Sequence, residues 1–375
     1  MSRSQARILQ HWAKMRILCL ALLGLAPLAA EPVVSHAELA GHITQALKLS
    51  GGERVLLRFD PAYFSELRAP LDKALRAAKA VPSFLAAAEP LRAPRLEGVD
   101  VFVRLPLGSS ARVLSKEEDA ALIAWVDKGG TRRELHFHWS DGSRGPDGLP
   151  VQHPPAFDGL YADALNIDYA ALNAAQERAI ALLSRGTVRV QTPAGTDLMF
   201  RTGKRPFNRQ NGDASAARMA SARVRVDRHI ELPAGAVRVA PVEGGVFGQL
   251  VLPEARFGDT VAKKVVIQID NGRITSLRAE QGLDAVKAAL QAGGDAAQQV
   301  REFALGFNPK LTMTPGGPVV PYYGYGAGVV RIGLGDNEEL GGAVRGGFVR
   351  WLFLTDASLH VDYTYLVKDG KLVLP

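Results

Sequence analysis

Cysteine is almost absent from this sequence. Its single cysteine, Cys19, lies in an apolar run near the start of the chain, and no Leu-Ala-Gly type of sequence precedes it as lipid attachment would require. Residues 31–375 can therefore form no disulfide, no thiolate zinc site and no cysteine nucleophile. A chain without free thiols is compatible with export to an oxidising compartment.

Acidic residues are absent from the first thirty positions, which carry Arg3, Arg7, Lys14 and Arg16. The formal charge of the whole chain is +7, but the remaining residues have 41 basic side chains against 38 acidic ones. A balance of +3 is too weak for a general nucleic-acid binder, so we expect no nucleic-acid partner. Apolar residues make up 47% of the chain and charged residues 22%, as in ordinary globular proteins.

Residues 1–30 are typical of a secretory signal peptide. Lys14 and Arg16 precede the apolar run 17–25, and small residues end the segment at 29–30. An uncleaved membrane anchor is the alternative, but the run is shorter than the roughly 20 apolar residues that a span needs, and Pro27 interrupts it. We therefore predict an exported protein, periplasmic or secreted, without stable membrane insertion after cleavage. Translation starts at Met1 or Met15.

Helical and extended patterns alternate through the first half of the chain. Apolar residues recur at helical spacing over 36–50, 66–80 and 116–127, and strands are predicted at 54–59, 99–105 and 135–139. This alternation predicts an α/β fold with a parallel sheet and helices on its faces.

The pattern changes near residue 185. A helix at 169–183 ends at Arg185-Gly186, and short β-rich pieces follow at 187–192, 198–202, 222–226, 245–252 and 265–269, with helices at 282–292 and from about Ala296. The predicted organisation is a signal peptide at 1–30, an N-terminal α/β domain at 31–185 and an α+β C-terminal domain with a metal site at 186–375.

Two candidate metal ligands lie near the C-terminus. Residues 358–362 alternate like a strand, so His360 and Asp362 are expected on one face. An imidazole and a carboxylate at this spacing can coordinate one metal ion together. The other interpretation of this pair is a hydrogen-bonded surface contact.

Glu302 is a third candidate ligand. It stands at the end of a helical pattern and enters the apolar segment 303–309. A buried carboxylate at this place needs a cation or several hydrogen bonds. The alternative is a solvated residue at a helix end.

Five segments between residues 190 and 375 carry a family resemblance when they are taken together. They are GTDL at 195–198, LPAGAV at 232–237 before Ala240-Pro241, EFALGFNP at 302–309, RIGLG at 331–335 and SLHVD at 358–362 before an Asp-Gly turn. In order and approximate spacing they resemble the aminopeptidase T and staphylococcal aminopeptidase family of metallopeptidases. No single segment is specific, whereas five in the same order are.

The resemblance implies a dinuclear metal site that activates a water molecule to cleave an N-terminal peptide bond. Carried over residue by residue, Glu302, His360 and Asp362 match metal ligands of the family. Other ligands are missing, because Gly235-Ala236 stands where a glutamate is expected and residues 324–330 contain no carboxylate.

Arg331 stands where the family has a histidine ligand. Because arginine stays protonated it cannot bind a metal, but beside the acidic ligands its charge can replace a missing cation. The resemblance therefore implies one divalent metal ion, either zinc, cobalt, manganese or iron, held by Glu302, His360 and Asp362. Arg331 is then the expected catalytic residue, as an electrostatic partner.

The 2,5-dihydroxypyridine 5,6-dioxygenases form a second branch with a similar fold. That branch uses one iron held by a histidine and an H-x-D pair. In this chain Glu302 would take the place of the first histidine. The resulting ligand set is more anionic than the usual triad of two histidines and one carboxylate.

Two other groups of residues have chemical potential. His136 and His138 share one face of a predicted strand and are able to bind metal, but without a nearby carboxylate motif we interpret them as a substrate-facing or surface pair. Tyr322, Tyr323 and Tyr325 either line a pocket or anchor the packing of a glycine-rich segment.

The main functional hypothesis is an exported metal-dependent hydrolase that resembles aminopeptidases and releases N-terminal residues from peptides. One alternative is a mononuclear-metal enzyme, not a peptidase, related to the dioxygenases. Another is an inactive relative that binds peptides or amino acids. The expected partner is a peptide or small-molecule substrate, and the resemblance also implies a possible homodimer.

Overall fold

The parallel sheet predicted for the first part of the chain is present in the computed structural model, which describes residues 34–313 and 317–375. Residues 36–375 belong to one compact unit. The predicted signal peptide at 1–30 lies outside the described residues. The sheet has the strand order β2-β1-β3-β4-β8 and is parallel throughout. Its strands are β1 (Arg54–Phe59), β2 (Val81–Ala86), β3 (Val101–Arg104), β4 (Arg133–Phe137) and β8 (His229–Leu232).

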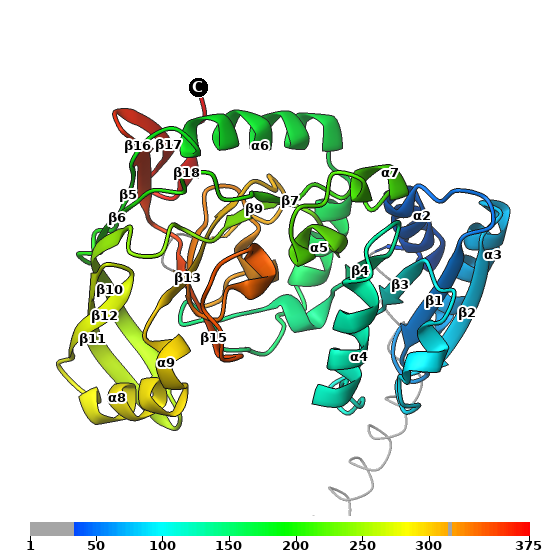
Figure 1. Ribbon diagram of the computed structural model, residues 1–375, viewed down its shortest axis with the longest axis horizontal. Helices are drawn as coiled ribbons and strands as arrows, with labels where there is room; N and C mark the ends of the chain where they lie inside the picture. The colour runs from blue at the N-terminus through cyan, green and yellow to red at the C-terminus, as the bar shows by residue number, and fades with distance from the viewer. Residues whose placement is uncertain (1–33, 314–316) are drawn as a thin grey trace, which may run out of the picture. The chain divides into compact units, whose positions relative to one another are not determined.

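Helices accompany this sheet and the rest of the unit (Figure 1). They are α2 (His36–Leu47), α3 (Arg68–Ala77), α4 (Lys116–Val126), α5 (Phe157–Leu165), α6 (Tyr169–Leu183), α7 (Ala216–Met219), α8 (Leu283–Ala292) and α9 (Gly294–Ala297). Within the described residues, no helix combines the length and the apolar character that crossing a bilayer requires.

Helix α4 shows how one face of the parallel sheet is covered. Ser115 and Glu118 form a capping box at its start, which satisfies backbone N–H groups of the first turn. Trp125 of this helix packs with Leu56 of β1 and Phe102 of β3 in one apolar cluster. Burying a side chain of this size stabilises the fold by about 1.5–3 kcal/mol, so this contact fixes the helix on the sheet.

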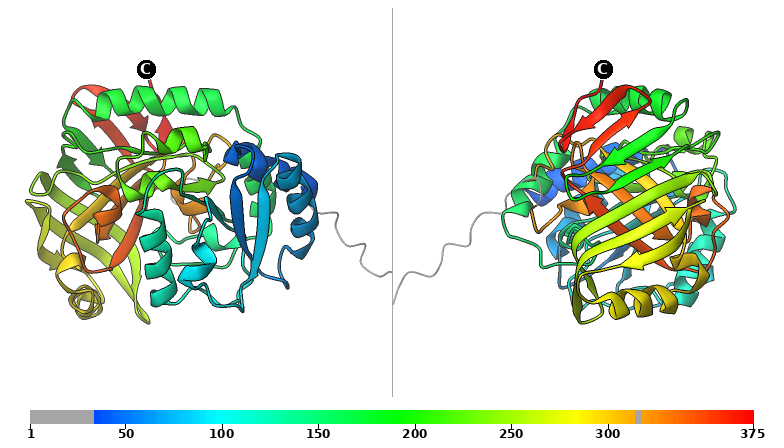
Figure 2. Two further views of the ribbon diagram at one scale, coloured as in Figure 1. Left: turned by 45° about the vertical axis from the view of Figure 1, so that its right-hand side comes forward. Right: turned by 90° about the vertical axis from the view of Figure 1, so that its left-hand side faces the viewer.

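Two antiparallel sheets complete the unit. An eight-stranded sheet has the order β12-β11-β10-β6-β5-β16-β17-β18, and a five-stranded sheet has the order β15-β14-β13-β9-β7. The long β10–β11 hairpin and the strands near the C-terminus belong to the same larger sheet, with β6 and β5 between them (Figure 2). The bounds are β5 (Val188–Gln191), β6 (Asp197–Phe200), β7 (Asn208–Gln210), β9 (Ala236–Val239), β10 (Val246–Phe257), β11 (Thr260–Asp270), β12 (Arg273–Arg278), β13 (Val300–Gly306), β14 (Val330–Gly335), β15 (Val349–Leu354), β16 (Ser358–Val361), β17 (Thr364–Lys368) and β18 (Lys371–Leu372).

The α/β class is confirmed, with a parallel sheet followed by antiparallel ones. The boundary near residue 185 stays a prediction. Strand β8, which comes after that boundary in the sequence, is the edge strand of the parallel sheet beside β4.

Two local predictions were wrong. Glu302 lies inside strand β13, not at the end of a helix, and the preceding helix α9 has only four residues. All seven residues of β13 are buried, so the strand lacks the alternation that distinguishes strand from helix. The strand predicted at 222–226 is also absent, since Arg225–Arg228 forms a 3-10 turn there.

Candidate functional site

Ionisable side chains form a row across four neighbouring strands of the parallel sheet. Arg58 pairs in register with Arg104, Arg104 with His136, and His136 with Glu231. Register partners of adjacent strands point to the same face. One row earlier, the same face carries apolar Leu56 and Phe102 on β1 and β3, and ionisable Glu134 and His229 on β4 and β8. The ionisable row lies toward the carboxyl ends of the strands, which is where open α/β sheets bind their ligands.

His136, His138 and Asp141 form the one group of three potential metal ligands in the described chain. One ligand atom from each lies within 4.8 Å of the others. The two histidines are two residues apart at the end of β4 and share a face. Asp141 reaches back from the 3-10 turn Ser140–Gly142, where its Oδ2 lies 2.9 Å from His138 Nδ1.

The two histidines differ in charge. Burial, together with the charges of His138 and Arg104, lowers the pKa of His136 well below its usual value. Burial also opposes protonation of His138, but the carboxylates of Asp141 and Glu231 outweigh it and raise the pKa of His138. The surroundings therefore favour the neutral form of His136 and the charged form of His138.

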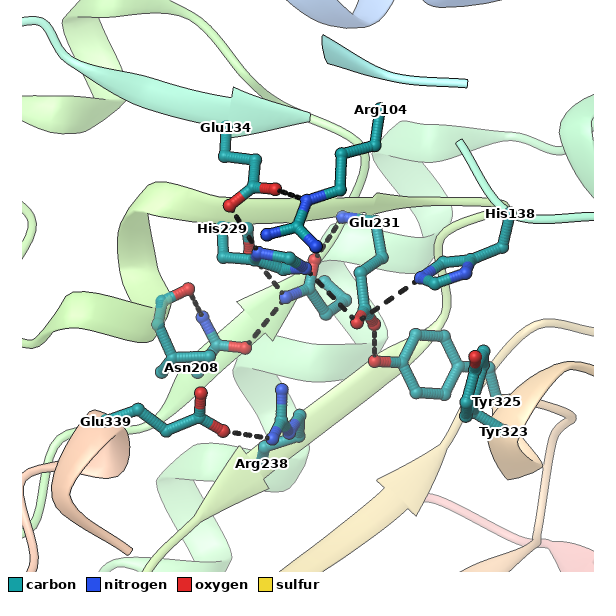
Figure 3. Close-up of polar contacts among 12 residues, drawn as sticks. Arg104, Glu134, His138, Asn208, His229, Glu231, Arg238, Tyr323, Tyr325 and Glu339 are labelled. Atoms are coloured by element: carbon teal, nitrogen blue, oxygen red, sulfur yellow. Dashed lines mark hydrogen bonds and ion pairs between the residues drawn. The ribbon is translucent and has the colours of Figure 1, made fainter. Parts of the chain in front are cut away.

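Glu231 is the central carboxylate of the network (Figure 3). Its Oε1 lies 3.9 Å from His138 Nε2 and 3.6 Å from His229 Nε2, and its Oε2 accepts a hydrogen bond from the Tyr325 hydroxyl. Burial favours the neutral acid, but the contacts with both histidines lower the pKa of Glu231 well below its usual value. Glu231 is therefore an ionised carboxylate inside the protein.

His229 is held as a cation between two acids. Its Nδ1 lies 3.1 Å from Glu134 Oε2, and Glu134 is also paired with Arg104. Burial lowers the pKa of His229, but the charges and hydrogen bonds of Glu134 and Glu231 outweigh this and raise it to about 10. His229 thus supplies a permanent positive charge next to Glu231.

Aromatic rings close the site on the side of residues 322–325. The rings of Tyr322 and Tyr323 lie 5.7 Å and 4.9 Å from the ring of His138, measured between centroids. Tyr323 also accepts a hydrogen bond at its hydroxyl from Arg144 Nη2, at 3.0 Å. The rings of Tyr322 and Tyr323 thus pack against His138 on this side of the site.

Glu302 lies among arginines. It is fully buried, its Oε2 accepts a hydrogen bond from Arg238 Nη2 at 3.0 Å, and its Oε1 lies 2.9 Å from Arg331 Nε. A third guanidinium, that of Arg301, lies 3.5 Å away. Burial would raise the pKa of Glu302, but these three cations lower it to about 2. The expected pairing of Arg331 with this carboxylate is thus present.

His360 and Asp362 lie in the other antiparallel sheet. His360 is on β16, between register partners on β5 and β17, and its Nδ1 lies 2.7 Å from the backbone oxygen of Asp362. Asp362 has a left-handed backbone with φ of 50°, and its Oδ1 accepts a hydrogen bond from the Thr187 N–H. The left-handed residue ends the strand alternation, so the expected shared face is lost.

The structure does not bring Glu302 together with His360 and Asp362. Their ligand atoms do not form a group within 4.8 Å, and each side chain has other partners. The donor set at Glu302 also does not suit a metal, because three guanidinium groups already neutralise one carboxylate. We therefore derive no chemistry from a metal at Glu302.

The sequence contained a signal for the observed group that our interpretation did not use. The segment HFHWSD at 136–141 places two histidines and an aspartate within six residues. Asp141 supplies the carboxylate that the two histidines need, because the 3-10 turn Ser140–Gly142 brings it back to them. No sequence pattern near Glu231 indicates that it belongs to the site, because it reaches the histidines only through the pairing of β8 with β4.

Comparisons with known proteins show the fold. No protein-family model matches the sequence, and no curated protein matches it. The fold is similar to that of 2,5-dihydroxypyridine dioxygenase from Pseudomonas putida KT2440, with a TM-score of 0.62 and 17% identity over 91% of this chain and 99% of that one. It is also similar to the AmpT protein from Thermus thermophilus, with a TM-score of 0.59 and 15% identity over 89% of this chain and 98% of that one. The chain thus shares a fold with AmpT and with a dioxygenase.

Proposed function

We propose that this protein is a metal-dependent hydrolase whose mononuclear centre is held by His136, His138 and Asp141. The observation that carries the proposal is the convergence of these three ligand atoms within 4.8 Å. Ligand atoms bound to one zinc ion at about 2.0–2.2 Å lie roughly 3.3 Å apart, so small side-chain movements are sufficient. Two imidazoles and one carboxylate form a common set for a catalytic zinc ion with an open position.

A divalent metal in this set supplies a Lewis acid that makes water more acidic. Glu231 is the residue placed to accept the proton from that water, because its carboxylate is ionised and lies 3.9 Å from His138 Nε2. The hydroxyl of Tyr325 holds Glu231 in place from the other side. The positive charge of His229, whose Nε2 lies 3.6 Å from Glu231 Oε1, favours the ionised form of Glu231.

The substrate in this proposal is a peptide or another small amide or ester. The fold shared with AmpT supports an aminopeptidase-like reaction, in which the N-terminal residue of a peptide is released. Export is supported by the sequence pattern of residues 1–30. A homodimer remains an expectation from the family resemblance.

An iron-dependent oxygenase is the second candidate. Two histidines and one carboxylate with open positions are also the ligand set of non-haem iron oxygenases. The fold shared with the 2,5-dihydroxypyridine dioxygenase also favours an oxygenase. In this set, His136 and His138 provide two imidazoles, whereas the predicted set of Glu302, His360 and Asp362 had only one.

Metal analysis of purified variants tests the proposal. We expect the wild type to retain one zinc, cobalt, manganese or iron ion per chain, and His138→Ala and Asp141→Asn to lose it. His360→Ala is the matched control, because it removes an imidazole outside the centre. Equal metal content in all four proteins would reject the centre.

The activity assay then separates the two candidates. Hydrolysis of aminoacyl anilides restored by zinc or cobalt supports the hydrolase. Oxygen uptake that depends on ferrous iron supports the oxygenase. A wild type that binds none of these metals is an inactive binding relative, and both enzymatic proposals then fail.

A further inference from the structure

The arginine cluster around Glu302 has more positive than negative charge. Three buried guanidinium groups, those of Arg238, Arg301 and Arg331, face two carboxylates, those of Glu302 and Glu339. Arg238 donates to Glu302 at 3.0 Å and to Glu339 at 2.9 Å. An uncompensated buried charge is unfavourable, so the cluster is suited to receive one more anion.

Arg331 is an arginine of this cluster with an unused hydrogen-bond donor. Its Nε lies 2.9 Å from Glu302 Oε1, and its Nη1 donates to the backbone oxygen of Tyr323 at 3.0 Å. Its Nη2 is buried and has no hydrogen-bond partner among the described residues. Only 2% of Arg331 is exposed, so solvent does not replace that partner. Buried donors of this kind are uncommon and call for an explanation.

Two further buried donors belong to the same aromatic group. Trp351 Nε1 and the Tyr322 hydroxyl also have no partner among the residues described. The guanidinium of Arg331 lies over the rings of Trp351 and Tyr325, at 5.1 Å and 5.7 Å from their centroids. The ring of Tyr323 is 5.7 Å from that of Trp351. Flat apolar surfaces thus surround an arginine with a free donor.

The backbone between Arg331 and the histidines is strained. Tyr322 and Tyr323 are consecutive residues with left-handed backbones, with φ of 39° and 51°. Such conformations are unfavourable for tyrosine and persist where the surroundings impose them. The hydrogen bond from Arg331 to the oxygen of Tyr323 is one of these restraints.

We propose that Arg331 binds the carboxylate of an aromatic organic acid, with Trp351 and the tyrosines against its ring. A carboxylate matches the planar fork of arginine and would accept from Nη2, and the Trp351 N–H provides a second donor. The site lies beside His138, whose ring is 4.9 Å from that of Tyr323. That the bound acid is the substrate of the metal centre rests on the proposed function. The carboxylate site itself does not.

Binding of benzoate and benzamide to the metal-free protein tests this site. The two probes have the same ring and nearly the same shape, but only benzoate is charged. Titration calorimetry in the presence of a chelator is expected to show that the wild type binds benzoate at least about tenfold more tightly, as a hydrogen bond to a charged group predicts. Because no metal is present, failure of the metal centre cannot change this result.

Three variants locate the contact. Arg331→Gln is expected to remove the preference for benzoate, and Arg345→Gln, at a half-exposed arginine paired with Glu338, is expected to keep it. Trp351→Phe keeps the ring and removes one donor, so it should weaken benzoate binding even if Arg331→Gln fails to fold. Equal binding of the two probes to the wild type, or an unchanged preference in Trp351→Phe and in a folded Arg331→Gln protein, would overturn the proposal.

Discussion

The imidazole rings of His136 and His138 are stacked, with centroids 3.4 Å apart and planes inclined by 31°. At this distance two imidazolium ions would repel each other strongly. The surroundings distinguish the two rings, since the contact with Asp141 favours the charged form of His138 while burial favours the neutral form of His136. A divalent cation in place of the proton on His138 would bring both rings to the same charge state.

Metal ions should stabilise the protein through this pair. A ligand that binds only the folded state adds about 2.7 kcal/mol of stability at one hundred times its Kd. We therefore expect zinc or cobalt to raise the melting temperature of the wild type and of His360→Ala, and to leave His138→Ala unchanged. Differential scanning calorimetry with and without metal measures this. A metal effect that disappears in His360→Ala would place the site elsewhere.

Glu302→Gln should destabilise the protein strongly at neutral pH. The substitution removes a buried carboxylate that contacts three buried guanidinium groups, and breaking a buried pair in this way costs about 3–5 kcal/mol. Glu254→Gln, at an exposed carboxylate, is the matched control and should change stability by no more than about 0.5 kcal/mol. Denaturant unfolding measures both. A loss in Glu302→Gln as small as in the control would contradict the view that this carboxylate is needed.

The carboxylate of Glu302 also makes the stability of the folded protein fall as the pH falls. The pKa of Glu302 in the folded protein is about 2, below the ordinary value of 4.5. Its stabilising effect is therefore complete above the ordinary pKa and disappears as the pH falls toward 2. The difference in stability between wild type and Glu302→Gln should shrink over this range.

Periodicity identified the elements that have one exposed face. The helix predicted at 169–183 has these bounds as α6, and the strand predicted at 54–59 is β1. Helix α6 carries a pattern of buried and exposed residues, whereas the four central residues of β1 are all buried and the strand is marked instead by the Gly51-Gly52 break before it. Strand β13 was mistaken for a helix end because all its residues are buried, so its apolar run has no period.

The candidate site was predicted only in part. The sequence identified Arg331 and Glu302 as partners because an arginine stood where a metal ligand was expected. It did not show that Arg238, on β9, brings a second guanidinium to the same carboxylate. Likewise the histidines of β4 meet Glu231 only because β8 joins the parallel sheet from a distant part of the chain. Such contacts depend on strand pairing, which local patterns do not encode.

A substitution at Gly148 tests whether the loop after Asp141 is fixed against the backbone of Trp351. A Cβ atom at Gly148 would lie 1.9 Å from the backbone oxygen of Trp351, and the residue has φ of 84°. Gly148→Ala should therefore cost about 2 kcal/mol or more. Gly52→Ala is the matched control, with φ of 90° and open space around it, and should cost only the backbone term of about 1 kcal/mol. Equal losses in the two variants, measured by denaturant unfolding, would show that the loop moves freely.

Glu231→Gln should separate proton transfer from metal binding. If Glu231 accepts the proton from water, its amide should lower kcat for aminoacyl anilides by about 10²–10⁴-fold. Metal content should stay at the wild-type level, because Glu231 is not among the three ligands of the centre. Parallel measurement of kcat and bound metal distinguishes this role from a purely structural one, since a collapsed centre would lose both. A Glu231→Gln enzyme with wild-type kcat would assign the base to another residue.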